Sequence, residues 1–91
     1  MRRKRVSDML AEGAKIVDAR SPSEFGSGHY PGAINIPLDK LQARMKQLGG
    51  RDSSIIVYCA SGSRSRVVAS HLRASGFTNV VNAGGISSMP R

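Results

Sequence analysis

The sequence predicts an α/β fold, with a small, mainly parallel sheet of about four or five strands flanked by helices on both faces. Short apolar or β-branched runs alternate with segments of helical periodicity along the whole chain. The run at residues 55–58 is apolar at every position, which is typical of a strand buried on both faces of a parallel sheet. Helices that connect such strands form right-handed crossovers, which place helices on both faces.

The first part of the chain predicts a helix, a strand and a capped helical turn. Residues 7–12 predict a short helix with Ser7 as its cap, and residues 15–19 form the first strand. Residues 21–24 read Ser-Pro-Ser-Glu, with proline at the first helical position and glutamate placed for a capping box. The glycines and prolines around residues 33–36 predict a turn followed by a short strand.

The second part continues the alternation. Leucine and methionine recur at helical spacing over residues 38–48, with charged residues between them, which predicts an amphipathic covering helix. Residues 65–75 predict a further helix that a glycine ends. Residues 80–81 predict a last short strand, and the two glycines at 84–85 predict a turn into the terminal segment.

The segment between the apolar run and the second of these helices reads Cys-Ala-Ser-Gly-Ser-Arg-Ser and has the features of a nucleophile loop. The first turn of a helix has unpaired N–H groups and a partial positive charge, so it favours an anion placed there. Small side chains and a central glycine allow consecutive amides to point inward as an anion-binding nest. The candidate site residues are Cys59 as the nucleophile, with Ala60, Ser61, Gly62, Ser63, Arg64 and Ser65 as substrate-binding residues.

Cys59 is expected to be a reactive thiolate. A free cysteine has a pKa near ~8.5, whereas one at a helix N-terminus beside a cation can fall to ~3.5–7.5. Arg64 is the obvious cation. Lowering the pKa by ~2 units needs about 2.7 kcal/mol, which loop amides, the helix dipole and one guanidinium can supply together. A lone cysteine at a strand end is more often a small buried hydrophobe, so the combination of features carries this prediction.

Several segments resemble the rhodanese (sulfurtransferase) family. The family's active-site loop has a cysteine, four residues and a closing position often filled by arginine, a spacing that Cys59 and Arg64 share. Further segments are similar to the family's other signatures and occur in the family's order over nearly the whole chain: residues 16–20, 24–25, 28–37, 76–77 and 84–85.

The resemblance implies a rhodanese-like domain over residues 1–91. It places Asp18 and Arg20 near the cysteine loop as supporting residues, where Asp18 could hold the loop by hydrogen bonds. For Arg20 with Glu24 we favour a structural ion pair or a capped turn. The chain departs from the family at Met89, where members often have tryptophan, and at Ala60, where thiosulfate-preferring members often have a basic residue.

Chemistry and resemblance together imply sulfur transfer through a persulfide of Cys59. The thiolate takes the outer sulfur of a small oxyanion donor such as thiosulfate, and cyanide or a thiol, including a thiol of a partner protein, accepts it. One cysteine and two histidines are too few for a closed zinc set, so we expect no metal, and the resemblance implies no cofactor. With no second cysteine, the sulfur must leave to an external acceptor.

Other functions remain open at this point. A persulfide carrier or protein-docking domain with little free turnover would keep the same cysteine. Phosphatases and arsenate reductases on a similar scaffold use a loop with one residue more between cysteine and arginine, which ranks them lower. His29 lies in a predicted turn and His71 lies inside a predicted helix, so we expect neither to act as a base for Cys59.

Length and composition limit the other classes of function. The 91 residues suffice for one domain, and the net charge of +8 includes the basic residues of a terminal arm, residues 1–5, that we expect to be flexible. Two tyrosines, two phenylalanines and no tryptophan are too few aromatic residues for a nucleic-acid stacking surface. No export signal or membrane-spanning run follows the basic start, and a single cysteine suits a reducing compartment, so we expect a cytoplasmic protein.

Overall fold

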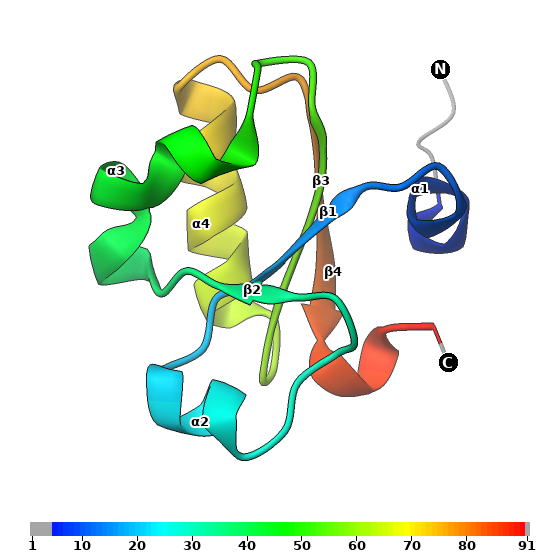
Figure 1. The fold of residues 1–91 in the computed structure, drawn as a ribbon, viewed down its shortest axis with the longest axis vertical. Helices are drawn as coiled ribbons and strands as arrows, with labels where there is room; N and C mark the ends of the chain where they lie inside the picture. Colours follow the sequence, from blue (N-terminus) through cyan, green and yellow to red (C-terminus); the bar gives the residue numbers. More distant parts are fainter. Residues whose placement is uncertain (1–4, 91) are drawn as a thin grey trace.

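The computed structural model describes residues 5–90, in which a four-stranded parallel sheet lies between helices (Figure 1). The strands are β1 (Lys15–Asp18), β2 (Ile34–Asn35), β3 (Ser54–Cys59) and β4 (Asn79–Gly85). They lie in the order β2-β1-β3-β4, and every neighbouring pair is parallel. The predicted fold class is confirmed, and the carboxyl ends of β1 and β3 lie side by side, where polar side chains can meet.

Helices cover both faces of this sheet. On one face lie α3 (Leu41–Arg44) and α4 (Ser63–Ala74), with the 3₁₀ turns η1 (Leu38–Lys40) and η2 (Met45–Leu48) on either side of α3 (Figure 1). The other face is covered by α1 (Val6–Ala11) and the 3₁₀ turn η3 (Ile86–Ser88). The short helix α2 (Pro22–Gly26) lies beyond the carboxyl ends of the strands, at the bottom of Figure 1.

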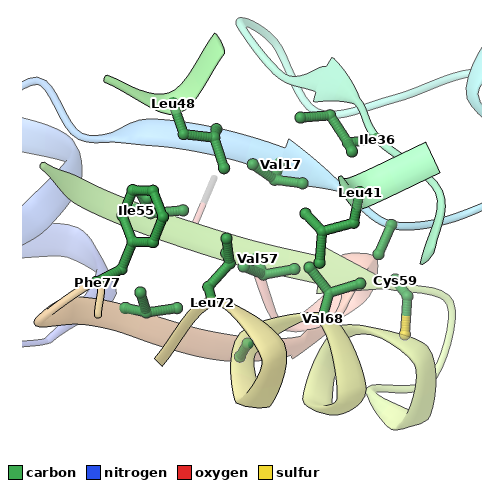
Figure 2. Close-up of a cluster of buried hydrophobic side chains, with 13 residues drawn as sticks. Val17, Ile36, Leu41, Leu48, Ile55, Val57, Cys59, Val68, Leu72 and Phe77 are labelled. Carbon is green, nitrogen blue, oxygen red and sulfur yellow. The ribbon is translucent and has the colours of Figure 1, made fainter. Parts of the chain in front are cut away.

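The central strand β3 contributes side chains to both cores. Ile55, Val57 and Cys59 belong to the cluster beneath α3 and α4 (Figure 2), whereas Ile56 and Tyr58 belong to the cluster beneath α1. Successive residues of a strand point to opposite faces, so a strand with a helix layer on each side needs an uninterrupted apolar run. This alternation directs the Cys59 side chain toward α4.

Two of the predicted helices differ from the structure. The cap of α1 is Arg5, whose side chain makes no capping hydrogen bond, so the prediction that Ser7 caps this helix was wrong. Val6 packs with Met9 in the cluster beneath α1, and this packing starts the helix before the serine. The covering helix over residues 38–48 is divided into η1, α3 and η2, with few fully buried side chains to stabilise a continuous helix.

The predicted turn at residues 84–85 was also wrong, because both glycines belong to β4. Val57 pairs with Asn82, but the next residue, Tyr58, pairs with Gly84, which leaves Ala83 as an extra residue in β4. Such a bulge bends a strand and redirects its side chains. The bend occurs beside Cys59, so it shapes the edge of the cysteine loop.

Local signals gave other elements correctly. The capping box of α2 is present, since the Ser21 hydroxyl accepts from the Glu24 amide and the Glu24 carboxylate accepts from the Ser21 amide. The predicted flexible arm at residues 1–5 lies outside the described residues except for Arg5, which is exposed. Within residues 5–90, the helices are all too short or too polar to cross a lipid bilayer.

Candidate active site

The cysteine loop joins the end of β3 to the start of α4. Cys59 is the last residue of the strand, and α4 begins at Ser63. Gly62 caps the helix with a φ of +100°, in the left-handed region that favours glycine. A Cβ atom at Gly62 would also lie 3.2 Å from the Cα atom of Gly84, so the loop backbone packs closely on the bulged strand.

Donors from the first turn of α4 surround the Cys59 sulfur. Sγ accepts hydrogen bonds from the Gly62 amide at 3.0 Å, the Ser65 amide at 3.4 Å and the Ser65 hydroxyl at 3.3 Å. Cys59 is fully buried, whereas Ala60 and Ser61 above it are exposed. The geometry is that of an anion-binding nest with the sulfur at its base, as the loop sequence predicts.

These contacts set the acidity of Cys59. Burial raises the pKa of the thiol, but hydrogen bonds from the Ser65 hydroxyl and from the amides of Ser65, Ser61 and Gly62 outweigh it and lower the pKa to about 7. Hydrogen bonds to the charged form favour that form, which is the physical cause of the shift. A large fraction of Cys59 is therefore thiolate at neutral pH.

Ser65 has a second partner that the sequence did not reveal. Its hydroxyl lies 2.7 Å from Asn82 Oδ1 and 3.2 Å from the Gly62 carbonyl oxygen, two acceptors besides the Cys59 sulfur, and it has only one proton to donate. The same Asn82 oxygen accepts from the Gly84 amide at 2.9 Å, while its Nδ2 donates to the Gly62 carbonyl at 3.3 Å. Asn82 therefore ties the bulge of β4 to the loop and competes with the sulfur for the Ser65 proton.

Arg64 does not point its guanidinium into the nest. Its Nη1 and Nη2 donate to the two carboxylate oxygens of Glu24 at 2.7 and 3.1 Å. The hydrogen bond to Glu24 is the largest cause of the raised pKa of Arg64, and the negative charge of Cys59 makes a smaller contribution. The thiolate and the guanidinium are therefore close enough to attract each other. The predicted cation is near the sulfur, but it is paired with a carboxylate from α2.

Asp18 and Arg20 form a buried network at the end of β1. Asp18 Oδ2 lies 2.8 Å from the Arg20 guanidinium and accepts from the Tyr58 hydroxyl at 2.7 Å. Burial raises the pKa of Asp18, but the hydrogen bonds from Arg20 and Tyr58 outweigh this effect. The pKa of Asp18 is therefore below its usual 3.8. The Asp18 side chain bonds to these residues and not to the loop amides, so it holds the strand ends together rather than the loop itself.

Arg20 pairs with a different carboxylate from the one expected. It pairs with Asp18 and donates to the Gly28 carbonyl at 2.7 Å, whereas Glu24 caps α2 and pairs with Arg64. The expected link between Arg20 and Glu24 is replaced by these two pairs. One ion pair joins residues two apart and the other joins residues 40 apart, and spacing along the sequence does not reveal the second.

Neither histidine contacts the Cys59 sulfur through a hydrogen bond in the described residues. His29 stacks on Phe25 with ring centroids 3.7 Å apart, and its Nδ1 lies 2.9 Å from the Phe25 carbonyl, so its contacts are structural. His71 is exposed on α4. Across residues 5–90 there is no group of three or more His, Cys, Asp or Glu side chains placed to hold a metal ion.

Comparison with known proteins identifies the family. The profile of the rhodanese-like domain matches residues 3–89. The chain belongs to the rhodanese family. It is 35% identical over 78 residues to the thiosulfate sulfurtransferase PspE of Escherichia coli, covering 82% of this chain and 75% of that protein. It is 33% identical over 81 residues to a sulfurtransferase of Allochromatium vinosum, covering 88% of this chain and 75% of that protein.

Solved structures show the same fold for other rhodaneses. A rhodanese with anions from E. coli superposes with a TM-score of 0.80 at 33% identity, over 86% of this chain and 95% of that one. The human single-domain sulfurtransferase TSTD1 gives a TM-score of 0.79 at 26% identity, over 88% and 83% of the two chains. Some relatives are longer: the chain covers 56% of the uncharacterized protein YqhL of Bacillus subtilis, to which it is 39% identical over 72 residues.

Proposed function

We propose that this rhodanese domain is a sulfurtransferase that moves sulfane sulfur from a donor such as thiosulfate to cyanide or a thiol through a Cys59 persulfide. One observation supports this most directly: the Cys59 sulfur lies in a nest of hydrogen-bond donors at the start of α4, with a pKa lowered to about 7. A thiolate at neutral pH is the species that attacks a sulfane sulfur.

The proposed first step transfers one sulfur atom to the enzyme. The Cys59 thiolate attacks the outer sulfur of thiosulfate, a new S–S bond forms, and the original S–S bond breaks with its electron pair leaving on sulfite. The terminal sulfur of the persulfide then has the negative charge that the thiolate had. Loop amides and the Ser65 hydroxyl, which hold the thiolate, are placed to stabilise that anion as well.

The second step passes the sulfur to an acceptor. Cyanide or an acceptor thiolate attacks the terminal sulfur, the persulfide S–S bond breaks, and the electron pair returns to Cys59. Because the chain has one cysteine, no internal thiol can resolve the persulfide, and the acceptor must come from outside. Two half-reactions on one covalent intermediate predict ping-pong kinetics. A reducing cytoplasm, which keeps a single thiol free, suits this chemistry.

The burial of Cys59 restricts which sulfur donors can reach it. The sulfur lies at the base of the loop, beneath exposed residues such as Ala60 and Ser61. A donor must therefore present its transferable sulfur as a terminal atom, while the rest of the molecule stays outside the nest. Thiosulfate and alkyl persulfides both have such a terminal sulfur, whereas a bulky disulfide does not.

The test is the mass of the intact protein. Reduced protein incubated with excess thiosulfate should gain one sulfur atom, lose it on addition of cyanide, and produce thiocyanate in equal amount. Cys59→Ser should gain no sulfur under the same conditions. No gain by the wild-type protein, although Cys59 reacts with iodoacetamide, would contradict the proposal.

A carrier function is the second candidate, and the same site supports it. The putative sulfur carrier protein YrkF of B. subtilis is 35% identical over 71 residues, although this chain covers only 38% of that protein. A carrier would load sulfur on Cys59 but release it faster to a protein thiol than to cyanide. Comparing the two release rates after loading distinguishes a carrier from a free-standing enzyme.

Phosphatase or arsenate reductase chemistry ranks lower for this loop. Four residues separate Cys59 from Arg64, and the Arg64 guanidinium is bound to Glu24 rather than directed into the nest. We therefore expect that wild-type protein and Cys59→Ser show the same background rate of phosphoester hydrolysis. Hydrolysis that depends on Cys59 would reverse this ranking.

A further inference from the structure

Two arginines near the nucleophile loop, Arg64 and Arg20, are already paired with carboxylates, and a third, Arg66, lies with Ser70 and Arg73 on the exposed face of α4. Arg64, within the loop, makes a two-point contact with Glu24, and Arg20, at the end of β1, pairs with Asp18 at 2.8 Å. The two arginines are close enough to repel each other: the charge of Arg20 lowers the pKa of Arg64, although the Glu24 hydrogen bond and other contacts raise it overall. Neither guanidinium is left as a free positive charge for an anionic donor.

Glu24 is held in this position by its own helix. Its Oε1 accepts from the Ser21 amide at 3.1 Å and from the Ser21 hydroxyl at 3.0 Å, as part of the capping box of α2. The Arg64 hydrogen bond first, and those from Ser21 next, lower the pKa of Glu24 to about 2, so it stays ionised at any physiological pH. The carboxylate is therefore positioned before a substrate arrives.

The ion pair of Arg64 and Glu24 is partly exposed to solvent beside the nucleophile loop. The Arg64 and Glu24 side chains are 41% and 36% exposed, whereas Cys59 is buried below the loop. The loop residues between the cysteine and this arginine, such as Ala60 and Ser63, have no charge. With the thiolate formed, Cys59, Arg64 and Glu24 together have a net charge of −1. A donor with two negative charges is repelled more strongly by this site than a donor with one.

We propose that Glu24 is a specificity-determining residue that turns the site away from dianionic thiosulfate and toward a sulfane donor with a single negative charge, namely an alkyl persulfide. This inference rests on the proposed sulfur-transfer function and names the donor class of the same site. The thiolate attacks the terminal sulfur of R–S–S⁻, a Cys59 S–S bond forms, and the donor S–S bond breaks. The electron pair leaves on the alkyl thiolate R–S⁻, so atoms and charge balance without another reactant.

The test variant is Glu24→Gln, which removes the charge and keeps the capping box, because glutamine is also favoured at that position. The control is Asp52→Asn, which makes the same change in net charge. Asp52 precedes the amino end of β3, whereas Cys59 is at its carboxyl end. Thermal unfolding of the variants verifies that each is folded before rates are compared.

Two matched pairs of reagents measure the charge preference. Iodoacetate and iodoacetamide differ by one charge and alkylate Cys59 whatever its biological role. Thiosulfate and the persulfide of 2-mercaptoethanol also differ by one charge, and loading is followed by intact mass. Each ratio is referred to the same ratio for a small free thiol, so that intrinsic reactivity cancels.

One elementary charge at about 6 Å from the reacting atoms, in a dielectric near that of water, changes a rate by roughly threefold per unit of reagent charge. Glu24→Gln should therefore raise the iodoacetate-to-iodoacetamide ratio and the thiosulfate-to-persulfide ratio by about threefold each. Asp52→Asn should leave both ratios unchanged. The wild-type protein should load from the persulfide in preference to thiosulfate, once referred to the free thiol.

The outcomes separate this inference from the proposed function. Unchanged ratios in Glu24→Gln, or a wild-type preference for thiosulfate, would overturn the role of Glu24 while sulfur loading itself stands. A shifted alkylation ratio with no loading from either donor would instead refute sulfur transfer, and with it the donor class, although the charge effect of Glu24 on the site would stand.

Discussion

Removing the Ser65 hydroxyl should raise the pKa of Cys59 and change its reactivity in opposite directions at pH 7 and pH 9. Ser65→Ala deletes one of the donors to the sulfur and leaves the Ser65 amide in place. A hydrogen bond to a charged group contributes about 1.5–3 kcal/mol, which corresponds to about 1–2 pKa units. Asn82 Oδ1 at 2.7 Å and the Gly62 carbonyl oxygen at 3.2 Å compete with the sulfur for the hydroxyl proton, so we expect the lower end, about one unit.

The thiolate fraction and the thiolate nucleophilicity then move against each other. With a pKa of about 7 the wild-type protein is about half thiolate at pH 7, and a variant with a pKa near ~8 is about one-tenth thiolate. Each thiolate of the variant should be roughly three times more nucleophilic, because nucleophilicity rises with basicity with a slope of about 0.4–0.5. The variant should react about twofold more slowly at pH 7 and about threefold faster at pH 9.

The assay is the rate of alkylation by iodoacetamide between pH 5.5 and 9.5, read by intact mass. Iodoacetamide is uncharged, so the pH dependence reports Cys59 rather than the reagent. Ser63→Ala is the matched control, since Ser63 lies in the same loop, is exposed and is not among the residues that donate hydrogen bonds to the sulfur. Superimposable profiles for Ser65→Ala and the wild-type protein would refute the reasoning and assign the low pKa to the amides alone.

Three further variants test other parts of the site. Gly85→Ala would place a Cβ atom 2.5 Å from the Ala60 carbonyl oxygen. It should lower the unfolding free energy by about 1–3 kcal/mol in denaturant melts and also lower the reactivity of Cys59. Gly26→Ala is the control, because a Cβ atom there has open space around it and should change the unfolding free energy little. Asp18→Asn breaks a buried ion pair and should lower the unfolding free energy by about 3–5 kcal/mol at neutral pH. Because the folded-state pKa of Asp18 is depressed, that stability should be lost as pH falls below its usual 3.8, and melts from pH 7 to pH 2 should show the wild-type and variant curves converging. Asn82→Asp should raise the pKa of Cys59, because it adds a negative charge beside Ser65, and a pH profile of alkylation that stays at the wild-type midpoint would contradict this.

The features that could be predicted from the sequence are those that local chemistry determines. The capping box of Ser21 and Glu24 depends on residues three apart, and the apolar run of β3 reports its burial directly. The nest around Cys59 likewise depends on neighbours within a single loop. Where packing competes with a local preference, as at Ser7 in α1, the local rule failed.

The features that were missed depend on contacts between distant segments. The partner of Arg64 is Glu24, 40 residues away, and the partner of Ser65 is Asn82, 17 residues away. Both contacts follow from the order of strands in the sheet and from the bulge in β4, which no periodicity in the sequence reports. An asparagine two residues before paired glycines is the signal that could have drawn attention to the bulge.

The pKa of Cys59 suits its role as the attacking nucleophile in the proposed cycle. A lower pKa would give more thiolate at neutral pH but a weaker nucleophile, and a higher pKa would leave most of the sulfur protonated, so attack is fastest when the pKa is near the ambient pH. The value of about 7 meets this condition because burial, which raises the pKa, is opposed by amide donors and by a hydroxyl that Asn82 also binds. The balance between burial and these donors therefore gives Cys59 a pKa near neutrality, rather than the lower value that the loop donors alone would give.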